Sequence, residues 1–288
     1  MRTPLHKYYR FSFMAIGIIA GLLVSCTGNQ NSREKIAEAS NEYKLVWQDE
    51  FDYSGLPDTT KWRWDTEGNE DGWGNKELQF YTDKRIENSS VDSGFLHITA
   101  LREEMNGKKY TSARLNSKFS FQYGRVEVGA KLPDGRGTWS AIWMMPASWS
   151  FKDGNWPDIG EIDIMEHVGH DPGVVHLSAH SKDYQWQKGT QKTATVFVSD
   201  ATGDFQNYWL EWSPDSLIGG VNDSTVFRYY NEHLGPDKWP YDKPFYLILN
   251  LAVGGEWGNV KGVDENAFPQ TLIVDYVRVY QLKNQDGA

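Results

Sequence analysis

The sequence is almost free of cysteine, which limits how its fold can be stabilised. Cys26 is the only cysteine among 288 residues. One thiol cannot form a disulfide within the chain, so the folded domain must depend on its own hydrophobic core.

Positive charge is also scarce. The chain has 29 Lys and Arg against 39 Asp and Glu, a formal net charge of -10. Loss of residues 1–25 would remove Arg2, Lys7 and Arg10, and the charge would become 26 minus 39, or -13. Such an acidic body repels phosphate backbones, so nucleic acid is not an expected partner, whereas a neutral polymer is compatible with it.

The N-terminal apolar run is too short to span a bilayer as a stable helix. FSFMAIGIIAGLLVS follows the basic MRTPLHKYYR, and the run leads into LVSC at residues 23–26. This pattern predicts a signal peptide over residues 1–25. Leu-x-Ser-Cys resembles the bacterial lipobox, which predicts lipidation of Cys26; the alternative is an ordinary signal peptide with a chance cysteine at its boundary.

The segment 26–43 is polar and predicts a tether between a lipid anchor and the folded domain. We therefore expect an exported bacterial lipoprotein that is anchored to a membrane. The cell surface of the outer membrane and the periplasmic face are both open as its location.

Long amphipathic helices are missing, and the apolar pattern has a period of two instead. Three stretches alternate, FLHITALR (95–102), YGRVEVGAKL (123–132) and TLIVDYVRVYQL (271–282), and FYLILNLAV (245–253) is continuously apolar. Turn sequences such as VDSG and LPDGRG separate strands of this kind. Without a linker or a repeat, residues 44–283 predict one all-β domain, a β-sandwich of jelly-roll type, followed by a tail at 284–288.

Aromatic residues are abundant. The chain has 13 Trp, 15 Tyr and 13 Phe, more than a single core requires. Exposed ring faces in a groove suit the flat apolar faces of sugars.

The segment GEIDIMEH (160–167) places three carboxylates in a short apolar strand. Side chains alternate along a strand, so Glu161 and Asp163 share a face and Glu166 should point away. A β-bulge at Ile164 or Met165 would return Glu166 to the acidic face. The two glutamates would then approach to about 5–6 Å, close to the separation of about 5–5.5 Å in retaining glycosidases.

Two other interpretations compete for these acids. One is a solvated acidic face with ordinary alternation. The other is a calcium site made by the same acids, although calcium ligands usually come from a flexible loop and a stiff strand is a poor place for them.

At these residues the chain also resembles a known family. WPDIGEIDIMEHVG is similar to the E-x-D-x-x-E signature of glycoside hydrolase family 16, in its laminarinase-like endo-β-1,3(4)-glucanase branch. Further similar segments follow in family order: DEFDYSG (49–55), GWGNKELQFYT (72–82), residues 113–146, LILNLAVGGEWGN (247–259) and VDYVRVYQ (274–281). The resemblance implies a concanavalin A-like jelly roll with a concave substrate cleft, and no cofactor for catalysis. It also implies Glu161 as nucleophile, Asp163 as its assistant and Glu166 as acid/base.

Candidate substrate-binding residues surround this strand. Trp139 and Trp143 share a strand face and belong either to the core or to the cleft floor, whereas Trp156 is the better candidate for stacking on a sugar. Arg114 and Asn75 match family positions that bind sugar hydroxyls, with a surface salt bridge and a turn as their alternatives. Weaker candidates are Glu77, Asn250 and Trp257.

The histidines give a less specific signal. His167 should face away from Glu166, while His176 and His180 share a face of the next strand, and one of them lines the leaving-group side. We expect His180 to contact substrate. The sequence offers these two histidines no third ligand at a spacing typical of zinc.

The resemblance also implies a structural calcium ion, with the matching positions Glu50, the backbone carbonyl of Gly94, and Asp275. Oxygen ligands from remote segments would join the N-terminal strand to the C-terminal one. The alternative for Asp275 is an ordinary exposed carboxylate.

These observations together predict a retaining endo-glycosidase acting on β-1,3-glucan such as laminarin, on mixed-linkage β-1,3/1,4-glucan, or on both. The alternatives are a glucan-binding module without catalysis, the same mechanism on a galactan such as agarose, and a transglycosylase. We expect a monomer.

Overall fold

The computed structural model describes residues 43–153 and 155–283. They lie in the second of two compact units of the chain, Glu42–Ala288. The predicted signal peptide, Cys26, the C-terminal tail and all but the last residue of the tether lie outside the described residues. Within the described part, no helix combines the length and the apolar character that crossing a bilayer requires.

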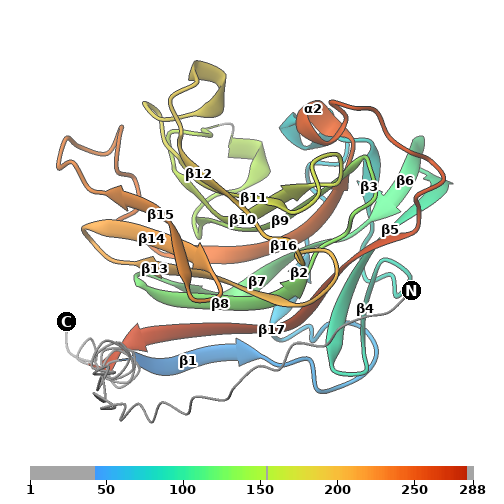
Figure 1. Ribbon diagram of the computed structural model, residues 1–288, viewed down its shortest axis with the longest axis horizontal. Coiled ribbons are helices and arrows are strands. Elements are labelled where there is room, and N and C mark those ends of the chain that lie inside the picture. Colours follow the sequence, from blue (N-terminus) through green and yellow to red (C-terminus); the bar gives the residue numbers. More distant parts are fainter. Residues whose placement is uncertain (1–42, 154, 284–288) are drawn as a thin grey trace, which may run out of the picture. The chain divides into compact units, whose positions relative to one another are not determined.

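Two β-sheets pack face to face in the described part of the chain, which confirms the predicted sandwich (Figure 1). The ten-stranded sheet runs in the order β15 (Ser224–Tyr230), β14 (Ser216–Val221), β13 (Gln206–Trp212), β8 (Gly124–Lys131), β17 (Gln270–Leu282), β5 (Phe95–Met105), β6 (Lys108–Ser112) and β3 (Gln79–Tyr81), with β1 (Tyr43–Asp49) beside β17 and β4 (Ser89–Asp92) beside β5.

The seven-stranded sheet runs in the order β12 (Lys192–Phe197), β11 (Val174–His180), β10 (Glu161–Val168), β9 (Thr138–Pro146), β16 (Phe245–Val253), β7 (Arg114–Phe121) and β2 (Trp62–Trp64). Helical segments are short: η1 (Gly72–Gly74), η2 (Phe151–Asp153), η3 (Trp186–Lys188) and α2 (Gly255–Gly258). The helix α2 and the segment that precedes β12 rise above this sheet, on the side away from the ten-stranded one (Figure 1).

The strands follow the apolar patterns in the sequence. In β5 the buried residues Leu96, Ile98 and Ala100 alternate with partly exposed ones, because one face meets the core. All nine residues of β16 are buried, since this strand is near the middle of its sheet and is covered on both faces. The predicted strand at 245–253 coincides with β16.

The main hydrophobic core lies between the two sheets. Ile142, Met144, Leu247 and Leu249 contribute to it from the seven-stranded sheet. Their neighbours along the strands point to the opposite face, where Met145, Tyr246 and Ile248 form a second, smaller cluster. Both faces of the seven-stranded sheet therefore bury apolar side chains. Only the inner face is covered by the other sheet, so a site can form on the outer face.

Candidate active site

A β-bulge in β10 brings the three carboxylates to one face of the sheet. Against β9, Asp163 is opposite Trp143 and Met165 is opposite Ile142, so Ile164 is the extra residue. Glu166 then lies opposite Ala141, which shares a face with Trp143. The register against β11 shifts between the same two acids. The predicted bulge is confirmed, and ordinary alternation with a solvated acidic face is wrong.

Strand pairing arranges the residues around the acids in rows. One row crosses the sheet through Asn116, Ile248, Trp143, Asp163 and Ser178, and the next passes through Arg114, Asn250, Ala141, Glu166 and His176. At the end of β10, Glu161 is opposite His180. Residues from four strands that are remote in sequence thus share one surface with the acids.

Each glutamate accepts a hydrogen bond from a tryptophan. Trp156 Nε1 donates to Glu161 Oε2 over 2.9 Å, and Trp139 Nε1 donates to Glu166 Oε1 over 3.0 Å. Asp163 between them is 3% exposed, and the Glu161 side chain is 15% exposed. One oxygen of each glutamate is therefore held by an indole.

Burial raises the pKa of all three acids, each to about 8. The charge of Asp163 raises the pKa of Glu161 and Glu166 further, whereas His180 opposes the rise at both glutamates. A hydrogen bond with Glu161 opposes the rise at Asp163. Near neutral pH the three acids together retain protons, and Glu161 and Asp163 are placed to share one.

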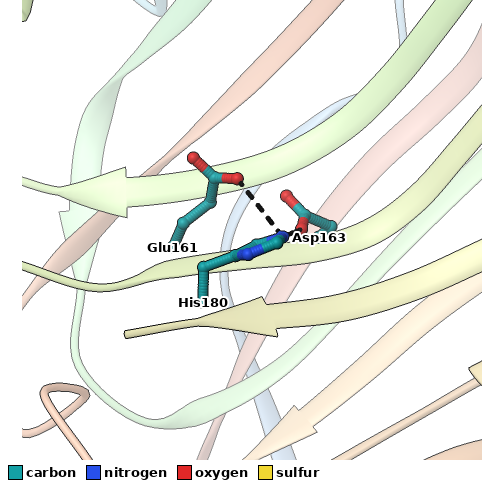
Figure 2. Close-up of side chains that lie close together, drawn as sticks. All are labelled: Glu161, Asp163 and His180. Carbon is teal, nitrogen blue, oxygen red and sulfur yellow. Dashed lines mark ion pairs between the residues drawn. The ribbon is translucent and has the colours of Figure 1, made fainter. Parts of the chain in front are cut away.

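His180 lies beside two of the acids (Figure 2). Its Nε2 atom is 3.3 Å from Asp163 Oδ2 and 3.9 Å from Glu161 Oε1. The side chain is almost completely buried, and its ring is tilted against that of Trp156. Tyr241 donates a hydrogen bond to the His180 backbone carbonyl over 2.8 Å. His180 therefore lies in the acid cluster, and its predicted contact with substrate stays a prediction.

Arg114 is held between two tryptophan rings. Its guanidinium carbon lies 4.5 Å from the centre of the Trp73 ring and 4.7 Å from that of Trp143. Its Nε atom is 3.1 Å from Asp65 Oδ2, in an ion pair without the alignment of a hydrogen bond. The buried Nη2 atom has no hydrogen-bond partner among the described residues. The alternative of a surface salt bridge is wrong, because Arg114 is only 5% exposed, and its predicted contact with sugar stays a prediction.

Trp73 and Asp65 belong to the site but were not predicted from the sequence. Trp73 stands two residues before Asn75 in GWGNK, and Asp65 follows the strand β2. The available signal for Trp73 was the segment 72–82, in which the sequence predicts only Asn75 and Glu77 as site residues. The backbone of Trp73 has a φ of 59°, unusual for so large a side chain, and its buried ring packs against Tyr81 and Phe151 as well as Arg114.

Glu77 is buried and hydrogen-bonded to two neighbouring side chains. Its carboxylate accepts hydrogen bonds from Asn75 Nδ2 over 3.2 Å and from Gln79 Nε2 over 2.6 Å. Burial raises its pKa despite these bonds. Glu77 is 6% exposed and its hydrogen bond orients the Asn75 side chain, so its predicted contact with sugar stays a prediction.

Asn250 is held in a similar way. Its Oδ1 atom accepts a hydrogen bond from Trp143 Nε1 over 2.7 Å, and its Nδ2 atom donates to the Tyr81 hydroxyl over 3.0 Å. Trp139 and Trp143 are partly exposed on the face of the acids, while their neighbours Ser140 and Ile142 are buried. Both tryptophans therefore lie outside the core between the sheets, although Trp143 packs against the second cluster, and their contact with substrate stays a prediction.

Trp257 on α2 closes the Glu166 side of this surface. Its ring makes edge contacts with Trp139 at 5.5 Å and with His176 at 4.7 Å between centroids. Burial lowers the pKa of His176. His167, next to Glu166, is fully buried and accepts a hydrogen bond from the backbone N–H of Gly173, which confirms that it faces away from the acids.

The predicted calcium positions converge at one point of the ten-stranded sheet. Pairing of β17 with β5 ends at Val274, and pairing with β1 begins at Val277, so Asp275 lies between the two partners. Gly94 directly precedes β5 and Glu50 directly follows β1.

The donor atoms at this point fit calcium only in part. Both carboxylate oxygens of Glu50 accept hydrogen bonds from Arg278, at 2.8 Å and 2.7 Å. The Glu50 side chain therefore does not fit as a ligand. Asp275 makes no side-chain hydrogen bond or ion pair within the described residues, so its carboxylate and nearby backbone carbonyls fit a hard cation.

Comparison with known proteins gives consistent matches. The family model described as Glycosyl hydrolases family 16 matches residues 60–278. A beta-glucanase from Rhodothermus marinus is 48% identical over 270 residues, covering 91% of this chain and 93% of the relative.

Two solved structures are similar at the level of the fold. The laminarinase from Rhodothermus marinus has a TM-score of 0.79 and 51% identity, covering 83% of this chain and 98% of that one. SCLam, a non-specific endo-beta-1,3(4)-glucanase, has a TM-score of 0.79 and 46% identity, covering 84% of this chain and 92% of that one. A mutant of SCLam was co-crystallised with 1,3-beta-D-cellotriosyl-glucose.

Proposed function

The chain belongs to glycosyl hydrolases family 16, and on that basis we propose that it is a retaining endo-β-glucanase. The proposed substrates are β-1,3-glucan such as laminarin and mixed-linkage β-1,3/1,4-glucan. The observation that carries the mechanism is the bulge at Ile164, which places two glutamates on one face with Asp163 between them. The names of the similar proteins support the choice of a glucan.

The reaction proceeds in two displacements. Glu161, as a carboxylate, attacks the anomeric carbon while Glu166 transfers its proton to the departing glycosidic oxygen. Glu166 then takes a proton from water, and the resulting hydroxide releases the sugar from Glu161 with its original configuration. Burial suits Glu166 to the first step because a raised pKa keeps this acid protonated near neutral pH.

Asp163 and Trp156 together favour the charged form of Glu161, the nucleophile. A proton shared by Asp163 and Glu161 moves toward Asp163 as Glu161 becomes the nucleophile. The hydrogen bond from Trp156 favours the charged form of Glu161. Two acids with opposite tasks can thus operate in one buried site.

Reducing-end release from laminarin, mixed-linkage glucan and agarose tests this function. We expect release from one or both glucans, complete loss in Glu161→Gln, and retained laminarin binding by that variant. Glu211→Gln, the same substitution on the ten-stranded sheet, is the matched control and should keep its activity. Release from agarose alone would overturn the glucan assignment, and binding without cleavage by the unaltered protein would favour a binding module.

Product size at high substrate concentration separates hydrolysis from glycosyl transfer. Products longer than the starting oligosaccharide would show that a sugar competes with water for the glycosyl-enzyme. We expect shorter products to dominate.

We also propose that the protein is a membrane-anchored lipoprotein. The support is the lipobox-like LVSC sequence and the polar segment that follows it. Cys26→Ser should abolish incorporation of labelled palmitate and release the protein from membranes. Unchanged labelling of the variant would contradict the assignment.

We propose that the protein also binds a structural calcium ion, without the Glu50 side chain among its ligands. Asp275 supplies a carboxylate, and backbone carbonyls near Gly94 and Glu50 supply neutral oxygens. A bound ion would stabilise the junction of β1, β5 and β17 and would take no part in catalysis.

A further inference from the structure

Glu161, Asp163 and His180 form a cluster of three potential metal ligands, here called the EDH cluster (Figure 2). One ligand atom from each residue lies within 4.8 Å of the other two. The strands β10 and β11 bring them together, since Glu161 is opposite His180. The sequence showed no third ligand for His180 because the pairing of two strands supplies it.

The distances within the EDH cluster are close to those around a zinc ion. A tetrahedral zinc ion with bonds of about 2.0–2.1 Å holds its ligand atoms about 3.3–3.4 Å apart. His180 Nε2 and Asp163 Oδ2 are 3.3 Å apart, and His180 Nε2 and Glu161 Oε1 are 3.9 Å apart. Of the three edges, the one between His180 and Asp163 already has the required length. Both edges that involve Glu161 lie within 4.8 Å, and rotation of this longer side chain would shorten them.

The atoms that face the centre of the cluster lack full hydrogen bonding. Asp163 is 3% exposed, and its Oδ2 atom has no hydrogen-bond partner within the described part of the chain, although it lies near His180 Nε2. A buried carboxylate oxygen without a partner is unusual and costly, and a cation would satisfy it. Trp156 holds the other oxygen of Glu161, so Oε1 is directed to the cluster.

We propose that the EDH cluster binds a divalent transition-metal ion, with Zn²⁺ as the best fit, and that the bound ion inhibits glucan cleavage. Three protein ligands leave a fourth position for water, as in open zinc sites. One nitrogen and two oxygens favour Zn²⁺, Cu²⁺ or Ni²⁺ over Ca²⁺, which takes six to eight oxygens. Inhibition follows because the ion occupies the oxygen with which Glu161 attacks. The inhibition rests on the proposed function, whereas the binding does not.

Calorimetric titration of Zn²⁺ into the purified protein tests the site directly. We expect a binding site whose affinity falls at least about tenfold in His180→Gln, because a ligand is lost. His176→Gln is the matched control: this histidine is on the same face of β11 but packs on Trp257, and the variant should bind Zn²⁺ as the unaltered protein does. Equal affinity in the unaltered protein and His180→Gln, or no binding at all, would overturn the proposal.

Circular dichroism establishes that each variant is folded. If His180→Gln is unfolded, Asp163→Asn replaces it with the same expected loss of affinity. Any binding by His6 or Cys26 is common to all variants and does not affect the comparison.

Kinetics then test the inhibition. Zn²⁺ should raise the apparent KM for laminarin at constant kcat, and calcium-saturated EDTA should reverse the effect without removing calcium. A Zn²⁺ site that depends on His180 but leaves cleavage unchanged would refute the inhibitory role. A protein that binds Zn²⁺ but cleaves no glucan would overturn the proposed function and leave the metal site intact.

Discussion

Trp139 donates its indole N–H to Glu166 Oε1 over 3.0 Å, and Glu166 is the proposed acid/base. This bond favours the charged carboxylate, so it opposes the rise in pKa that burial causes. In Trp139→Phe we expect the basic limb of the kcat/KM profile to move upward by about one pH unit, because Glu166 keeps its proton longer. Trp143→Phe is the control, since Trp143 donates to Asn250 and not to an acid. An unmoved basic limb in Trp139→Phe would contradict the assignment.

The loss of activity on removal of the Glu166 acid should depend on the leaving group of the substrate. Glu166→Gln cannot protonate the departing oxygen, so we expect laminarin cleavage to fall by a factor of about 100 or more. An aryl glucoside with a good leaving group needs no proton, and formation of its glycosyl-enzyme should be affected much less. Burst kinetics measure this step. Equal losses on both substrates would indicate that Glu166 has another role.

Arg114→Lys should weaken substrate binding although the charge is kept. The planar guanidinium stacks between Trp73 and Trp143, and an ammonium cannot reproduce that stacking or the Nη2 donor, which has no partner among the described residues. We expect KM for laminarin to rise about tenfold, with a smaller change in kcat. Arg63→Lys serves as the control because Arg63 contacts a single ring, that of Tyr246. Similar KM values for both variants would argue against the stacking as the cause.

His167 should make the fold sensitive to acid. Burial lowers its pKa from 6.5 to about 4, so the unfolded chain takes up a proton that the folded chain refuses. Above pH 6.5 His167 is neutral in both states and does not lower the free energy of unfolding. As the pH falls from 6.5 toward 4, protonation of the unfolded chain lowers that free energy by roughly 3 kcal/mol at most. Denaturant titrations of His167→Gln should show a flatter pH dependence across this window. His233→Gln, at an exposed position, should retain the original slope.

Removal of calcium should lower the melting temperature. A ligand at 100 times its Kd contributes about 2.7 kcal/mol, which is a shift of about 5–10 °C for a domain of this size. EDTA should cause this loss in the unaltered protein and have little effect on Asp275→Asn, which has already lost the carboxylate ligand. Asp223→Asn, an exposed turn variant, should still respond to EDTA. A melting temperature that EDTA does not change would refute the calcium site.

The local parts of the fold could be predicted because their signal is local. Alternation along β5 and the continuous run of β16 identify strands, and the broken spacing at Glu166 identifies a bulge. Each of these features is set by neighbours within a few residues.

Contacts between remote segments could not be predicted in the same way. Trp73 contacts Arg114. Arg278 binds the carboxylate of Glu50, 228 positions away in the sequence, although the calcium prediction assigned that residue to the ion. A resemblance between motifs identifies positions but does not say which partner occupies a side chain. His180 shows the same limit, because its ligand partners stand on another strand.

The bulge at Ile164 keeps the three acids on one face of the sheet although their spacing along the chain is uneven. If Ile164 were deleted, Glu161, Asp163 and the final glutamate would alternate regularly and would still share one face. A deletion at Ile162 would instead place Asp163 and Glu161 on opposite faces. The strand can therefore change its length by one residue at the bulge and keep its chemistry, so insertions and deletions among related sequences should concentrate at that position.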